Sequence, residues 1–234
     1  MKKDVLGVKV NDITIDEALA VVEKWICNPG KHYIVTPNPE FIIAAQKDNL
    51  FRKILNDADL SIPDGVGLKL AGKVKNTFSG TDFMEKLVNL SAEKGLTTGF
   101  LGGRDEVAKE CAECLQKKYP GLKVAMALGG GEVDKEGKTK DSIAIPPCDI
   151  LLVAFGHIKQ EKWIVNNLQT IPVKLAMGVG GAFDYLSGNV PRAPRLMRDL
   201  GFEWLFRLIL QPWRIKRQLA LCRYLWLTVF KGKQ

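Results

Sequence analysis

The sequence contains little histidine, no regular cysteine spacing and no long uninterrupted hydrophobic run. Only two of its 234 residues are histidines, His32 and His157, and they lie too far apart in sequence to suggest a metal site. The five cysteines are odd in number and lack the spacing of a disulfide framework. No apolar signal stretch follows Met1, so we expect a protein of a reducing, cytoplasmic compartment.

The composition is that of a globular chain with one sizeable core. Hydrophobic residues make up 46% of the chain and charged residues 26%, which excludes disordered, collagen-like and fibrous classes. A chain of this length forms one main domain with room for an appendage.

Residues 1–190 alternate short apolar, β-branched runs with longer amphipathic stretches. This alternation predicts an α/β fold with a Rossmann-like, mainly parallel sheet and helices on both of its faces. The expected strands are residues 33–36, 98–101, 123–128, 150–155 and 173–177. Turn residues collect in 56–81, which we expect to be mostly loop. Residues 191–234 are expected to form a C-terminal helical appendage.

The excess positive charge lies in that appendage. Residues 1–190 carry equal numbers of acidic and basic side chains, whereas residues 191–234 carry ten basic and two acidic ones, which accounts for the net charge of +8. Such asymmetry indicates a polyanionic partner for the tail: nucleic acid, an anionic membrane surface or a phosphorylated substrate.

Candidate site residues follow the expected strands, because ligands of open α/β sheets bind at the carboxyl ends of the strands. Thr36 ends the first expected strand and Asn38 follows it, in a loop that two prolines stiffen, although Asn38 could also be a simple helix cap. Asp64 lies in a glycine-flanked turn, where it is either a turn residue or a general base.

Further candidates follow the later strands. Gly102 and Gly103 precede a helix, so their backbone N–H groups could approach a phosphate. Gln160 and Glu161 fall in the first turn of the helix after the fourth strand, where they could reach the hydroxyls of a ligand or a uracil edge; surface capping is the alternative. Arg192 follows a glycine-rich turn, and its planar fork suits diphosphate oxygens.

None of the glycine clusters has the Gly-x-Gly-x-x-Gly spacing of a dinucleotide-binding fingerprint. A nicotinamide-dependent dehydrogenase is therefore disfavoured.

Seven short motifs span nearly the whole chain. They are Thr36-Pro-Asn-Pro-Glu40, Pro63-Asp-Gly-Val-Gly67, Gly80-Thr-Asp82, Lys159-Gln-Glu-Lys-Trp163, Gly178-Val-Gly-Gly-Ala-Phe-Asp184, Arg192-Ala-Pro194 and Gly201-Phe-Glu-Trp-Leu-Phe-Arg207. In this order they resemble the WecG/TagA/CpsF family, glycosyltransferase family 26.

The resemblance implies a bacterial, inverting, metal-independent transferase without a cofactor. Such enzymes move an N-acetylmannosamine-type sugar from a UDP donor to a polyprenyl-diphosphate-linked sugar during cell-surface polysaccharide synthesis. Asp64 then aligns with the general base, Thr36 and Asn38 with the substrate-pocket motif, and Gln160 with a donor-side glutamine. The chain departs from the family pattern at Thr77, where an arginine is expected to neutralise donor phosphates; Lys73 or Lys75 could replace it as point charges.

The appendage mixes basic and aromatic residues from Gly201 onward. Residues 219–230 are largely apolar but too few to span a bilayer, which takes about 20 helical residues, so we expect an interfacial helix at the inner face of the bacterial plasma membrane. Arg214 and Arg217 share one helical face and are expected to bind the diphosphate of the acceptor. Alternatively, Trp204 and its neighbours pack on the core or on a second copy in a homo-oligomer.

Two rival functions remain open. A membrane-recruited nucleotide-binding protein without transferase activity is favoured by Thr77. Nucleic-acid binding through the basic tail would give a steep dependence on salt, but the aliphatic content of the tail exceeds what a phosphate-binding arm needs. We therefore expect no nucleic-acid partner.

Overall fold

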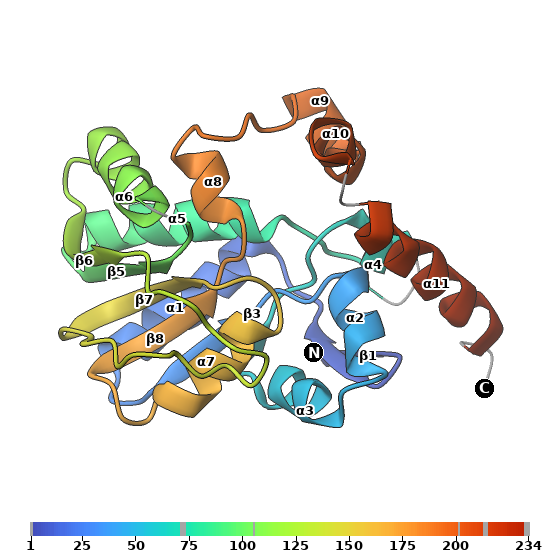
Figure 1. The fold of residues 1–234 in the computed structure, drawn as a ribbon, viewed down its shortest axis with the longest axis horizontal. Helices are drawn as coiled ribbons and strands as arrows, with labels where there is room; N and C mark the ends of the chain where they lie inside the picture. Colours follow the sequence, from blue (N-terminus) through green and yellow to red (C-terminus); the bar gives the residue numbers. More distant parts are fainter. Residues whose placement is uncertain (1, 71–73, 105, 201, 213–214, 232–234) are drawn as a thin grey trace.

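The protein folds around a six-stranded parallel sheet, as the sequence predicts (Figure 1). The computed structural model describes residues 2–70, 74–104, 106–200, 202–212 and 215–231. The strand order across the sheet is β4-β3-β8-β7-β5-β6, and every pairing is parallel. The strands are β3 (His32–Val35), β4 (Leu60–Ser61), β5 (Thr97–Gly102), β6 (Lys123–Leu128), β7 (Cys148–Ala154) and β8 (Val173–Gly178).

The central strand β7 shows why the sheet is buried on both sides. Ile150 and Leu152 belong to the hydrophobic cluster on one face, and Leu151 and Val153 belong to the cluster on the other; all four are fully buried. A continuous apolar run is typical of a strand that is covered on both faces.

Helices cover both faces of the sheet. Apolar side chains of α1, α5, α6 and α8 form the cluster on one face, and those of α7 form the cluster on the other. The helices of residues 1–190 are α1 (Ile15–Cys27), α2 (Pro39–Ala45), α3 (Asn49–Asp57), α4 (Val66–Leu70), α5 (Gly80–Glu93), α6 (Val107–Lys118), α7 (Lys159–Asn167) and α8 (Ala182–Leu186).

Two segments differ from the sequence-based expectation. The segment 56–81, expected to be mostly loop, contains β4, α4 and the start of α5. An antiparallel hairpin of β1 (Lys2–Val5) and β2 (Val8–Asn11), which the sequence analysis missed, packs its valines against α2 and α3.

The C-terminal residues form helices α9 (Arg195–Asp199), α10 (Glu203–Leu210) and α11 (Ile215–Lys231). The expected interfacial helix at 219–230 lies within α11, but one side of it packs against α2, where Tyr224 is fully buried. On the other side Leu219 and Trp226 are exposed. No side chain that the structure describes in α10 is buried.

Candidate active site

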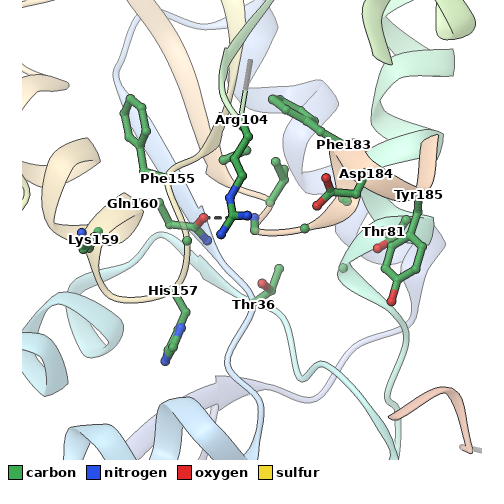
Figure 2. Close-up of a pocket in the computed structure, with 18 of the residues that line it drawn as sticks. Thr36, Thr81, Arg104, Phe155, His157, Lys159, Gln160, Phe183, Asp184 and Tyr185 are labelled. Carbon is green, nitrogen blue, oxygen red and sulfur yellow. Dashed lines mark hydrogen bonds between the residues drawn. The ribbon is translucent and has the colours of Figure 1, made fainter. Parts of the chain in front are cut away.

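A cleft of about 1010 Å³ lies at the carboxyl ends of the parallel strands. Loops that follow all six strands contribute to its lining. Five of the predicted site residues line it together: Thr36, Asn38, Asp64, Gly103 and Gln160. Figure 2 shows Thr36, Gln160 and Arg104 around its centre.

Asp64 follows β4 in a turn that is fixed from two sides. Its backbone N–H donates to the carbonyl of Pro37 at 2.9 Å, and its Oδ1 accepts from the backbone N–H of Gly80 at 3.2 Å. Burial raises the pKa of Asp64 to about 7, assisted by the negative charge of Glu203 and opposed by the Gly80 N–H and the charge of Arg207. A carboxyl group with this pKa can accept a proton near neutral pH.

Thr36 and Asn38 lie beside Asp64, on the loop after β3 whose Pro37 accepts the Asp64 N–H. Asn38 caps α2, because its Oδ1 accepts from the N–H of Phe41 at 3.1 Å, so it serves as the helix cap while it also lines the cleft. Thr36 packs against Gly80, where an added Cβ would lie 3.2 Å from its Cγ2. The glycine therefore lets the first turn of α5 approach this loop.

Gln160 and Glu161 form one hydrogen-bonded unit at the start of α7. The Gly180 N–H donates to Gln160 Oε1 at 3.0 Å, and Gln160 Nε2 donates to Glu161 Oε1 at 2.6 Å. Glu161 Oε2 accepts from the N–H of Ile158 at 2.7 Å. Burial raises the pKa of Glu161 to about 7, against the effect of these hydrogen bonds.

Glu161 does not line the cleft, contrary to the expectation that it reaches the ligand. It is fully buried, because its position three residues after Ile158 gives it the reach of a capping-box carboxylate, which folds back onto the backbone.

Gly102 and Arg192 also lie outside the lining of the cleft. Gly102 packs against β7, where an added Cβ would lie 2.7 Å from the backbone of Ala154, so only Gly103 reaches the cleft. Arg192 is not part of the lining, because acidic neighbours hold it: its Nη1 lies 2.7 Å from Asp82 Oδ1. Arg214 lies outside the described residues, as does the side chain of Arg217.

Two arginines of the cleft were missed as site residues. Arg207, from α10, lies 4.9 Å from the ring centre of Tyr185 and packs on Gly181, where a Cβ would collide with its guanidinium. The side chain of Arg104 is exposed, and its guanidinium makes no hydrogen bond or ion pair with any residue that the structure describes. Its position directly after Gly103 was the signal that could have identified it.

The described residues contain neither a candidate metal site nor a candidate membrane span. No three His, Cys, Asp or Glu side chains within the described ranges group so that they could hold a metal ion. Likewise, no described helix has the length and apolar character needed to cross a membrane.

Comparison with known proteins gives the family of the chain. The family model described as "Glycosyl transferase WecG/TagA/CpsF family" matches residues 3–234, nearly the whole sequence. The chain belongs to this family. It is thus a glycosyltransferase, and the cleft at the carboxyl ends of its strands is that of a transferase.

Curated members of the WecG/TagA/CpsF family are similar to this chain over most of their length. The N-acetylglucosaminyldiphosphoundecaprenol N-acetyl-beta-D-mannosaminyltransferase of Bacillus subtilis (strain 168) is 35% identical over 217 residues, covering 87% of this chain and 84% of the relative. The protein of the same name from Staphylococcus aureus (strain MRSA252) is 27% identical over 223 residues, covering 92% of this chain and 87% of the relative.

In this glycosyltransferase, the arginine side chains that line the cleft come from other positions than Thr77, where the family pattern has an arginine. Thr77 and Lys75 are not part of the described lining, and Lys73 lies outside the described residues. Arg104 and Arg207 line the cleft instead. Membership of the family supports a transferase over a nucleotide-binding protein without transfer, the alternative that Thr77 favoured.

Proposed function

We propose that this protein transfers an N-acetylmannosamine-type sugar from a UDP donor to undecaprenyl-diphosphate-linked N-acetylglucosamine, as one step in the synthesis of a cell-surface polysaccharide such as teichoic acid. The observation that carries this proposal is the meeting of Asp64, Thr36 and Gln160 in one cleft of a chain whose relatives are named for that transfer. We also propose that the transfer inverts the anomeric configuration and needs no metal ion.

Asp64 acts as the general base in this mechanism. Its carboxylate takes the proton from the acceptor hydroxyl while the hydroxyl oxygen forms a bond to the anomeric carbon of the donor. The bond from that carbon to the diphosphate oxygen breaks, and UDP leaves with the electron pair from the opposite face. One displacement of this kind inverts the anomeric centre, and the proton ends on Asp64.

The leaving diphosphate must be stabilised where its charge develops. Asp64 follows the edge strand β4, and Arg104 follows β5, four strand spacings or about 19 Å along the sheet. The donor sugar therefore lies at the Asp64 end, and the diphosphate extends toward Arg104. Arg104 and Arg207 supply positive charge there, and arginine can donate two parallel hydrogen bonds to a phosphate.

The acceptor carries a lipid, and we propose that the C-terminal helices meet it at the cytoplasmic membrane face. Large apolar side chains of α9, of its C-cap residue Leu200 and of α10 are exposed: Leu196, Leu200, Trp204, Ile209 and Leu210. The basic residues of 191–234 complement anionic lipid. Arg214 and Arg217 remain our candidates for the acceptor diphosphate. Co-sedimentation with anionic but not with neutral vesicles is the expected behaviour.

A transfer assay tests the proposed function. Candidate UDP-hexosamines are incubated with a short-chain polyprenyl-diphosphate-N-acetylglucosamine, and the lipid product is analysed by mass spectrometry and NMR. We expect one added N-acetylhexosamine, inverted anomeric configuration and an unchanged rate in EDTA. Binding of UDP without a product from any donor would instead support the nucleotide-binding alternative.

A further inference from the structure

The amide of Gln160 has a fixed orientation. A backbone N–H can only donate, so the 3.0 Å contact of the Gly180 N–H identifies the atom that it meets as Gln160 Oε1. The opposite end of the amide faces Glu161 Oε1 at 2.6 Å, which requires the NH₂ group on that side. The Gly180 N–H and the Glu161 carboxylate therefore assign the same orientation to the amide. If the amide were flipped, neither group would keep its hydrogen bond.

The fixed amide has one N–H donor left for a ligand, and its oxygen has one lone pair left. An NH₂ group has two N–H donors, and Glu161 uses one of them. Gln160 lines the cleft, and its amide points toward the cleft centre (Figure 2). Its free N–H can meet only an acceptor atom, and its oxygen already has the Gly180 N–H as a donor.

Glu161 is itself held in place from the other side. Its Oε2 accepts the N–H of Ile158 at 2.7 Å, in the loop between β7 and α7. Ile158 has a φ of 71°, a left-handed conformation that β-branched side chains rarely adopt. The carboxylate thus ties a strained loop to Gln160, and both of its oxygens are occupied by N–H donors.

We propose that Glu161 is a positioning residue that fixes Gln160 as a hydrogen-bond donor toward an oxygen of the bound nucleoside diphosphate sugar. This inference rests on the proposed function, because it assumes that the cleft binds such a donor. Glu161 makes no contact with the ligand and acts through Gln160 alone.

A double-mutant cycle tests this role, with the affinity for UDP measured by calorimetry at pH 8. In Glu161→Gln, an amide faces two N–H donors and can accept only one of them, so we expect UDP to bind about tenfold more weakly. Gln160→Ala should weaken UDP binding by about the same factor. Because Glu161 acts through Gln160, the double variant should bind UDP as Gln160→Ala does.

Glu113→Gln removes an exposed carboxylate on α6 and should leave UDP affinity unchanged. If Glu161→Gln weakens binding equally with and without Gln160, or not at all, the inference is wrong. Should Glu161→Gln unfold at the assay temperature, Glu161→Asp, too short to keep both bonds, replaces it in the cycle.

The same experiment separates this inference from the proposed function. Wild-type protein that neither binds UDP nor transfers sugar would contradict the proposed function. Wild-type protein that does both, with additive effects in the cycle, would contradict only the role of Glu161.

Discussion

At the residue scale, the chemistry of the cleft depends on opposing effects on the pKa of Asp64. Burial favours the neutral carboxyl, whereas the Gly80 N–H and Arg207 favour the carboxylate, and the pKa of Asp64 is raised to about 7. A carboxylate with the ordinary pKa of an aspartate would be a weaker base. The turn therefore provides a base that is strong enough to assist proton removal and is still largely ionised above neutral pH.

The dependence of activity on pH should follow this pKa. Only the ionised carboxylate of Asp64 can accept the proton of the acceptor, so kcat/KM should fall about tenfold for each pH unit below 7 and level off above about pH 8. Initial rates of transfer between pH 5 and 9 test this. A profile that stays flat down to pH 5 would exclude Asp64 as a base with this pKa.

Arg104 should contribute to binding of the donor. Arg104→Ala should weaken UDP binding about 10- to 100-fold, because a charged hydrogen bond to phosphate is worth about 1.5–3 kcal/mol. Arg104→Lys should recover only part of the affinity, since lysine lacks the planar fork. Lys109→Ala, which removes an exposed positive charge from α6, serves as the control. Equal UDP affinities of Arg104→Ala and the control would contradict the assignment.

At the scale of helices and strands, the sequence predicts the elements that are long enough to show a hydrophobic pattern. Residues 150–155 form a continuous apolar run, and β7 covers most of it. By contrast, β4 has only two residues and α4 five, so neither shows a period, and their place is set by pairing with β3 and by packing. Short elements of this kind depend on tertiary contacts that no local pattern records.

The same reasoning applies to the candidate site. Thr36 and Gln160 could be predicted from the predicted strands, whose carboxyl ends meet at one edge of the sheet. Asp64 was predicted from its glycine-flanked turn and the family motif, because the two-residue strand β4 before it was not foreseen. Arg207 belongs to α10, and its approach to Gly181 depends on how the C-terminal helices fold back. The pairing of Arg192 with Asp82 was missed for the same reason: the two residues lie 110 positions apart in the sequence.

Asp82 links the first turn of α5 to the segment that carries α9 and α10. Its Oδ1 lies 2.7 Å from Arg192 Nη1 and 3.5 Å from Arg198 Nη1. Asp82→Asn should weaken this link by about 1–2 kcal/mol, because the ion pairs are only partly exposed. We expect faster trypsin cleavage between residues 192 and 207, and a larger loss of transfer than of UDP binding.

Asp16→Asn is the matched control for this experiment. Its carboxylate, on α1, pairs with Lys86 of α5, the helix that also carries Asp82, but it is 82% exposed. Proteolysis of Asp82→Asn at the rate of this control would show that the ion pairs do not hold the segment.

At the scale of the whole molecule, the C-terminal residues have two relations to the rest of the chain. Helix α11 completes a hydrophobic cluster with α2, α3 and the N-terminal hairpin, whereas α9 and α10 expose apolar side chains and place Arg207 in the cleft. The net positive charge of the chain comes from this same region. Stability thus depends on the packed side of α11, whereas the proposed contact with lipid involves α9, α10 and the exposed side of α11.

Tyr224 tests the contribution of α11 to stability. Tyr224→Ala should lower the free energy of unfolding by about 3–5 kcal/mol, because a fully buried ring is lost. Tyr224→Phe should be neutral or stabilising by up to about 1 kcal/mol, because the hydroxyl is buried and bonds to no described residue. Urea unfolding measures both, with the exposed Leu219→Ala as control. A Tyr224→Ala variant as stable as this control would contradict the packing of α11.

Sugar transfer by Asp64→Asn, measured beside its affinity for UDP, tests the central claim most directly. Asparagine keeps the size of the side chain and an oxygen for the Gly80 N–H, but it cannot accept the proton. We predict UDP affinity within about threefold of the wild type and a transfer rate lowered by about 10²–10⁴ at pH 8. Transfer by Asp64→Asn at a rate near that of the wild type would contradict the account.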